Sequence, residues 1–121
     1  MSLNETFASI RVYHRKLGYD YTNATPEERM KYFREHALAL YQEVSEIVNS
    51  TPWKPWRCVE DQMFYMQNVP KEIVDCIFFL GSISEIFEIS PEELSITFNK
   101  VLASNYARIK SGYNNKPEER R

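Results

Sequence analysis

Hydrophobic residues recur at intervals of three and four positions along most of this chain, which is the spacing of one face of an α-helix. The segment from Pro26 to about Val48 shows this spacing clearly. Its apolar positions include Ala37, Leu40, Tyr41, Val44, Ile47 and Val48. Comparable segments run from Glu5 to Leu17, from about Pro70 to Glu88 and from Pro91 to about Lys110. The pattern predicts an all-α fold with four main helices and a core like that of a four-helix bundle.

Capping residues mark where these helices begin and end. Thr25-Pro26-Glu27-Glu28 and Ser90-Pro91-Glu92-Glu93 each place a hydroxyl residue before Pro and Glu, which is typical of a helix N-terminus. Gly18 and Gly112 directly follow periodic segments, where glycine commonly ends a helix. The run Asn49-Ser50-Thr51-Pro52 should stop the second helix.

The segment Trp53-Lys54-Pro55-Trp56-Arg57 cannot continue a helix, because it combines a proline with two tryptophans and follows Pro52 directly. Two tryptophan side chains are costly to leave in water, so we expect an ordered loop. Residues 60–66 should form a short helix or an irregular connection to the third main helix.

Length and composition bound the class of protein. The 121 residues suit one domain spanning residues 1–121, with a polar tail at 114–121 that we expect to be flexible. A formal net charge of −2 argues against a nucleic-acid partner. The longest apolar run, Cys76 to Leu80, is too short to span a membrane. Two cysteines without a CxxC partner and no signal-peptide pattern at Met1–Glu5 favour a cytoplasmic location.

Two acidic pairs stand out: Glu43-x-x-Glu46 and Glu72-x-x-Asp75. Residues three apart share a helix face, so two antiparallel helices would bring four carboxylates together. Four unpaired carboxylates cannot share a site of low dielectric constant without a cation. Hard oxygen ligands suit Mg²⁺ or Mn²⁺, and protein-bound magnesium usually also holds substrate phosphates. The pattern suggests metal-assisted hydrolysis of a nucleotide.

The alternative is that these pairs are solvated, as most Glu pairs on helices are. The chain would then be a small helical interaction module. Against this, Glu72-Ile-Val-Asp75 runs directly into Cys76–Leu80, which we expect to be largely buried. His14 and His36 have no Ser, Asp or Cys partner pattern, so we interpret both as surface or core residues.

The spacing of the two pairs resembles the ExxE…ExxD signature of the all-α nucleoside triphosphate pyrophosphohydrolases, which include MazG-like enzymes, dimeric dUTPases and phage dCTPases. Three segments point to the dUTPase and dCTPase branch. Trp53–Arg57 is similar to its Lys-x-Trp-Lys segment, and Glu72–Phe79 is similar to its Glu-x-x-Asp-x-x-His-Phe run. Asn105–Tyr113 is similar to its Asn-x-x-Arg-Gln-x-x-Gly-Tyr motif. The resemblance covers about residues 7–113.

The resemblance implies Mg²⁺-dependent cleavage of a deoxynucleoside triphosphate, dUTP or dCTP, to the monophosphate and pyrophosphate. A broad-specificity, MazG-like house-cleaning activity is the alternative. The implied metal ligands are Glu43, Glu46, Glu72 and Asp75, of which Glu43 or Glu46 would also orient or deprotonate the attacking water. A four-helix unit of this size with so many aromatic residues is expected to have an apolar face for a partner, so we expect a homodimer or homotetramer.

The implied substrate contacts are Lys54, Trp56, Asn105, Arg108, Lys110 and Tyr113. For each of them, loop packing or plain helix surface is the competing interpretation. The sequence departs from the family at Phe78, where the family has His, and at Ile109, where it has Gln. The N-terminal Gln that contacts the base in some dimeric dUTPases has no clear counterpart. These departures leave the metal ligands unchanged and leave the choice of base open.

Overall fold

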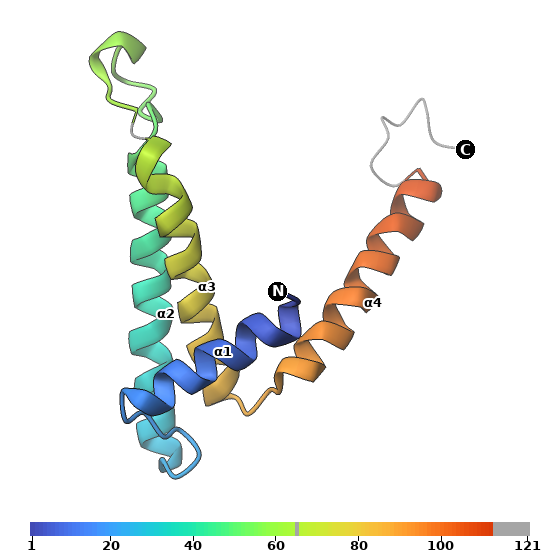
Figure 1. The fold of residues 1–121 in the computed structure, drawn as a ribbon. Coiled ribbons are helices and arrows are strands. Elements are labelled where there is room, and N and C mark those ends of the chain that lie inside the picture. The colour runs from blue at the N-terminus through green and yellow to red at the C-terminus, as the bar shows by residue number, and fades with distance from the viewer. Residues whose placement is uncertain (65, 113–121) are drawn as a thin grey trace.

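The computed structural model describes residues 1–64 and 66–112, and within them it contains four α-helices and no strand (Figure 1). The helices are α1 (Leu3–Lys16), α2 (Pro26–Asn49), α3 (Val69–Ile86) and α4 (Pro91–Lys110). Two 3₁₀ turns, η1 (Val59–Asp61) and η2 (Met66–Asn68), lie between α2 and α3. The all-α prediction with four main helices is confirmed. None of the described helices combines the length and apolar character that crossing a membrane requires.

Side-chain caps start three of the helices. Thr25 and Glu28 form a reciprocal capping box at the start of α2, as the sequence predicts. The Ser90 hydroxyl accepts a backbone N–H bond at the start of α4. The Ser2 hydroxyl does the same for α1, so this helix begins at Leu3, two residues before the predicted start.

A residue with positive φ follows the C-terminal ends of α1, α3 and α4. Gly18 and Gly112 adopt φ of 87° and 81°, the left-handed conformation that glycine tolerates best. α3 ends at Ile86, two residues earlier than predicted. There Glu88, with a φ of 58°, turns the chain out of the helix although it is not a glycine.

The helices pack in an open arrangement rather than around one shared axis (Figure 1). α2 and α3 lie side by side and antiparallel, and their interface is the most extensive between helices in the described part of the chain. α1 crosses them and packs on α3 and α4. α4 contacts α1 but diverges from the α2–α3 pair. The α2–α3 pair is therefore the scaffold that positions the two acidic motifs.

The core of the single chain is small. The buried apolar residues are Phe7, Ile10, Tyr21 and Ile86. The expectation that Cys76–Leu80 is largely buried is wrong, because none of its five residues is buried and Phe78 and Leu80 are exposed. Phe78, Phe87 and Phe98 are 36%, 45% and 55% exposed in the single chain and lie outside its core. The open packing of the helices leaves one side of α3 uncovered.

α1 and α3 approach each other closely at Gly81, where a Cβ atom would lie 2.7 Å from Ile10 Cγ2. Replacing Gly81 with Ala should therefore destabilise the protein by about 1–3 kcal/mol in urea denaturation. In an Ile10→Ala background the same change should be neutral or stabilising, because alanine favours a helix over glycine by about 1 kcal/mol. Equal effects in the two backgrounds would show that the close contact is not the cause.

Candidate active site

Because α2 and α3 pack antiparallel, the acidic motif on one helix faces the acidic motif on the other. Glu43 and Glu46 come from α2, and Glu72 and Asp75 come from α3. The negative charges of Glu43, Glu72 and Asp75 all act on the Cys76 thiol, whose pKa is raised by burial and then by these neighbours. The two motifs therefore face each other across the α2–α3 pair, but the four carboxylates do not converge on one point among the described residues.

Among the described residues of the two motifs, Glu43 is the one with a buried, unpartnered carboxylate oxygen. Its Oε2 atom is buried and has no hydrogen-bond partner among the described residues. The pKa of the Glu43 carboxyl is raised above its ordinary value, first by burial and then by the charges of Glu46 and Asp75. A buried acceptor without a partner is costly, so this oxygen fits the binding of a cation or a donor.

Asp75 differs from the prediction of unpaired carboxylates, because Lys71 Nζ lies 2.8 Å from its Oδ2. The two residues are one helical turn apart on α3, the ordinary spacing for such an ion pair. The pKa of Lys71 is raised by its hydrogen bond to Asp75 and by the charge of Asp75. A lysine four residues before Asp75 is the signal in the sequence for this pair, and the prediction of four unpaired carboxylates overlooked it.

The side chains of the two motifs do not form a closed cluster. Glu72 Oε2 lies 3.4 Å from the Ser50 hydroxyl at the end of α2, and Asp75 is held by Lys71. In the part of the chain that the structure describes, no three His, Cys, Asp or Glu side chains converge as a metal site. The donor set still suits a hard divalent ion, because it consists of carboxylate oxygens and includes the unpartnered Glu43 oxygen.

The segment Trp53–Arg57 leaves the helix, as predicted, and is held by specific contacts. Gln62 holds Lys54 by two bonds of 3.0 Å, one from the Lys54 N–H to its Oε1 and one from its Nε2 to the Lys54 carbonyl. Trp53 and Trp56 meet edge to face with ring centroids 5.5 Å apart, and Trp56 remains 70% exposed. Lys54 and Arg57 line a separate cavity of about 430 Å³, which does not include the acidic pairs.

The substrate residues expected on α4 lie away from the acidic motifs. Asn105, Arg108 and Lys110 are exposed on a helix that packs on α1 and not on α2 or α3 (Figure 1). Tyr113, like the tail at 114–121, falls outside the described residues. The structure of one chain therefore does not bring these residues to the carboxylates.

A cavity of about 600 Å³ opens beside Glu43 and Asp75, between α1, α2 and α3. Its other lining residues are Tyr13, His14, Leu17, Tyr19, His36, Phe78, Phe79 and Ser82. None of the sequence motifs predicted this cavity. Asp75, Phe79 and Ser82 follow at intervals of four and three on α3, and this helical spacing was a signal that they share one face.

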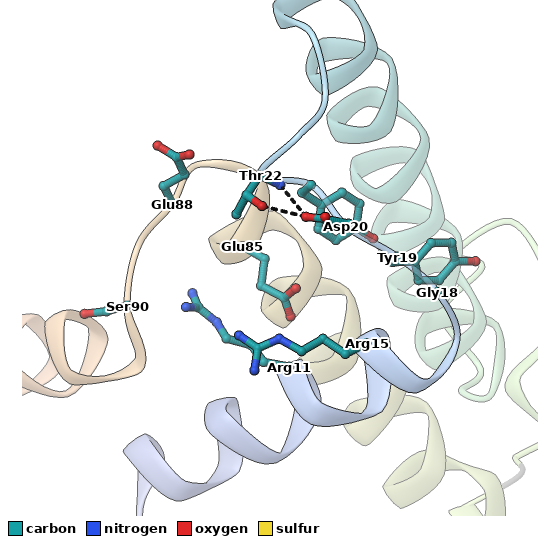
Figure 2. Close-up of a pocket in the computed structure, with 10 residues that line it drawn as sticks. Arg11, Arg15, Gly18, Tyr19, Asp20, Thr22, Glu85, Glu88 and Ser90 are labelled. Carbon is teal, nitrogen blue, oxygen red and sulfur yellow. Dashed lines mark hydrogen bonds between the residues drawn. The ribbon is translucent and has the colours of Figure 1, made fainter.

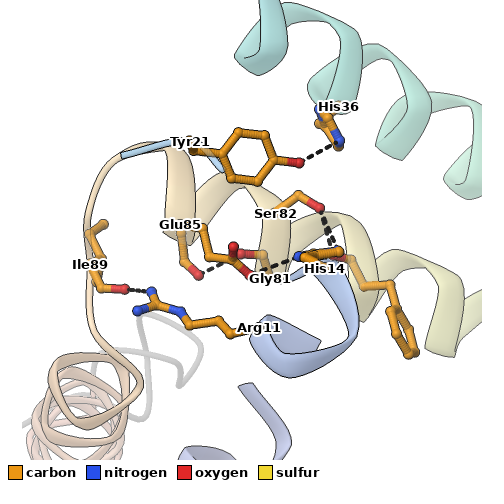
Figure 3. A network of polar contacts seen from close by, with 10 residues as sticks. Arg11, His14, Tyr21, His36, Gly81, Ser82, Glu85 and Ile89 are labelled. Carbon is orange, nitrogen blue, oxygen red and sulfur yellow. Dashed lines mark hydrogen bonds and ion pairs between the residues drawn. The ribbon is translucent and has the colours of Figure 1, made fainter. Parts of the chain in front are cut away.

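Three residues at the floor of this cavity, His14, His36 and Ser82, belong to a network of polar contacts that continues to Glu85 and Tyr21 behind them (Figure 3). His14 Nδ1 lies 2.7 Å from Glu85 Oε1, and His14 Nε2 lies 3.2 Å from the Ser82 hydroxyl. Nearby, the Tyr21 hydroxyl lies 3.3 Å from His36 Nε2. Burial raises the pKa of Tyr21 to about 12, so its phenol stays protonated near neutral pH. His14 lies in the core, one of the two positions we expected, but it also reaches a cavity beside the carboxylates.

A second cavity of about 670 Å³ lies at the turn between α1 and α2 (Figure 2). Arg11 and Arg15 lie there together with Asp20, Glu85 and Glu88. Acidic and basic side chains are mixed in this cavity, and Asp20 already accepts bonds from Thr22 and Asn23. It contains neither acidic motif, so it is distinct from the candidate active site.

Comparison with known proteins agrees with this geometry. A family model described as dUTPase matches residues 16–111, which include both acidic motifs and the loop between them. Searches of curated proteins and of solved structures give no match.

Proposed function

The chain belongs to the dUTPase family, and from this premise we propose that it is a Mg²⁺-dependent pyrophosphohydrolase of deoxynucleoside triphosphates, with dUTP or dCTP preferred. Family membership supports a nucleotide pyrophosphatase activity in general. The proposal adds the metal, the substrate and the residues. The observation that carries it is the unpartnered Glu43 oxygen beside the charges of Glu46 and Asp75.

Glu43, Glu46, Glu72 and Asp75 would hold the ion, with Mn²⁺ as a possible substitute. When bound, the ion would neutralise phosphate oxygens and lower the pKa of a coordinated water. Glu43 or Glu46 would orient the attacking water, since both lie on the same face of α2. Asp75 would exchange its Lys71 partner for the ion, which leaves the Lys71 ammonium free to approach a phosphate.

The roles of the remaining predicted residues stay proposals. Lys54 would contact the phosphates as a point charge, and Trp56 would stack on the base. Asn105, Arg108, Lys110 and Tyr113 belong to the C-terminal motif and would reach the substrate only if α4 came closer to an α2–α3 pair than it does within this chain.

A homodimer or homotetramer is also part of the proposal. Phe98, Leu102 and Ile109 share one side of α4, and they are 55%, 41% and 58% exposed. An apolar helix face of this kind is usually covered in a stable protein. A second copy of the chain would cover it and could supply α4 to a neighbouring acidic site. A monomeric mass by light scattering would contradict this.

The test is an assay of the purified chain with dUTP or dCTP, in Mg²⁺ or in EDTA. We expect monophosphate and pyrophosphate in Mg²⁺ and no turnover in EDTA. The identity of the products separates this chemistry from a phosphatase, which would release the diphosphate and inorganic phosphate. A chain that releases no pyrophosphate from any deoxynucleoside triphosphate, and gains no thermal stability from Mg²⁺, would be the interaction module instead.

A further inference from the structure

We infer that the cavity beside Glu43 and Asp75 is the nucleobase subsite, and that Ser82 determines its specificity by accepting a hydrogen bond from an N–H on the edge of a pyrimidine. The inference rests on the proposed function, since it takes the triphosphate to lie at the acidic motifs. It assigns a role to three residues outside those motifs: His14, Ser82 and Glu85.

The position and shape of the cavity suit a base. It is continuous with Glu43 and Asp75, so a nucleotide whose phosphates lie at the carboxylates can extend its base into it. Its volume of about 600 Å³ is within the usual range for small-molecule sites. Four of its lining side chains are Tyr13, Tyr19, Phe78 and Phe79. Flat aromatic side chains stack on any base, so the walls of the cavity supply affinity. Discrimination between bases must then come from the polar residues of the floor.

The hydrogen-bonding state of the floor follows from Glu85. A carboxylate only accepts, so His14 Nδ1 donates to Glu85 across 2.7 Å. In a neutral imidazole, His14 Nε2 is then the acceptor, and the Ser82 hydroxyl donates to it across 3.2 Å. The Ser82 hydroxyl thus donates its proton to His14, and its oxygen lone pairs remain to accept from a ligand.

The same result holds if His14 is protonated. His14 Nε2 then donates to Ser82, and the Ser82 proton turns to the Phe78 carbonyl, which lies 3.3 Å away. In both states Ser82 gives its proton to the protein. The Tyr21 hydroxyl also interacts with Ser82, but it donates its own proton to His36, so a lone pair of Ser82 stays free. Ser82 can therefore accept a hydrogen bond from a ligand and cannot donate one.

His36 is excluded as a second polar contact. Its Nδ1 atom lies 2.7 Å from the Tyr32 carbonyl, so this nitrogen donates. Its Nε2 atom then accepts from the Tyr21 hydroxyl at 3.3 Å. With both ring nitrogens engaged, His36 serves as a wall of the cavity.

The order Glu85, His14, Ser82 is also that of a hydrolytic triad, but its setting argues against nucleophilic catalysis. Ser82 lies inside α3, where backbone N–H groups are already bonded within the helix. None is left beside Ser82 to stabilise an oxyanion. The arrangement is therefore suited to fixing the Ser82 hydroxyl, with His14 as a positioning residue.

An N–H facing Ser82 has two pyrimidine sources, N3–H of uracil and the exocyclic amino group of cytosine. Free nucleosides distinguish them without any hydrolysis. We would titrate 2′-deoxyuridine, 3-methyl-2′-deoxyuridine and 2′-deoxycytidine into the full chain by NMR. If uracil is the ligand, 3-methylation should weaken binding at least about tenfold, because the donor is lost while the ring is kept.

The matched variants are Ser82→Ala and Ser84→Ala. Both serines are buried in α3, but Ser84 donates to the Gly81 carbonyl at 2.7 Å and does not line the cavity. Ser82→Ala should weaken the preferred nucleoside about tenfold and lower kcat/KM for its triphosphate by the same factor, whereas Ser84→Ala should change neither. The 3-methyl comparison uses wild-type protein, so it stands even if Ser82→Ala folds poorly.

The inference is overturned if Ser82→Ala binds deoxyuridine and deoxycytidine as wild type does, or if neither nucleoside binds the wild-type chain. It is also overturned if methylation has no effect on deoxyuridine and Ser82→Ala has none on deoxycytidine. Failure of the proposed function gives a different result, namely selective nucleoside binding without release of pyrophosphate from the triphosphate.

Discussion

Glu43→Gln should lower Mg²⁺-dependent pyrophosphate release by at least about a thousandfold. Among the described residues, Glu43 carries the one carboxylate oxygen of the acidic motifs that is buried without a partner, so a bound cation would satisfy this oxygen directly. Gln keeps the shape of the side chain and removes the charge that a hard cation requires. Losses of this size are typical when a charged group that acts on the transition state is removed.

The same substitution should stabilise the chain in EDTA. The pKa of Glu43 is raised, chiefly by burial and then by Glu46 and Asp75, so its ionised form opposes folding. For a carboxyl with a raised pKa, the favourable contribution is present at low pH and is lost as pH rises through the folded-state pKa. At neutral pH we therefore expect Glu43→Gln to have a higher Tm than the wild-type chain in EDTA.

Glu35→Gln is the matched control, because Glu35 lies on the same helix, is exposed and makes only a 3.9 Å contact with Lys31. It should change neither turnover nor Tm in EDTA. Thermal scans with and without Mg²⁺ complete the measurement: wild type should gain stability from the ion, and Glu43→Gln should gain much less. Wild-type turnover in Glu43→Gln would end the assignment of Glu43 as a metal ligand.

The features that the sequence predicted well are local ones. Helix starts at Thr25 and Ser90 depend on a side chain and a backbone N–H three residues away, so they are visible in a short window. The acidic pairs are predictable for the same reason, since a spacing of three fixes their shared face. The end of α3 was misplaced because Glu88 adopts a positive φ that nothing in its identity indicates.

Features that depend on the arrangement of whole helices were not predictable in this way. Cys76–Leu80 was expected to be buried from its composition, but α4 diverges and leaves part of α3 uncovered. The contact between His14 and Glu85 joins residues 71 positions apart, so no local pattern contains it. The cavity exists only because α1 crosses the α2–α3 pair, and its role therefore had to come from the structure.

The choice of base gives the second large effect. We expect kcat/KM for dUTP or dCTP to exceed that for dATP and dGTP by at least about a hundredfold in Mg²⁺. A site that pairs a buried polar group with one edge of the base rejects a base that leaves that group unpaired. Ser82 is 2% exposed and offers only an acceptor, so an ill-placed purine edge would leave it without a donor.

Phe78 bears directly on this expectation, because the family pattern has a polar residue there. In the structure Phe78 meets Tyr13 edge to face, with ring centroids 5.6 Å apart, and both line the cavity. This aromatic pair can cover a pyrimidine ring, but the Phe78 ring itself supplies no hydrogen bond that favours one pyrimidine over the other. Selectivity should then depend on the cavity floor and not on residue 78.

Steady-state kinetics with the four triphosphates and with the Phe78→His variant would test both statements. Phe78→His restores the family residue at the cavity wall, and we expect it to change the preference for pyrimidines over purines by less than about tenfold. Glu35→Gln, whose side chain is exposed and does not line the cavity, is the control. Equal kcat/KM values for pyrimidines and purines in the wild-type chain would contradict a base-selective floor and would favour a broad, MazG-like activity instead.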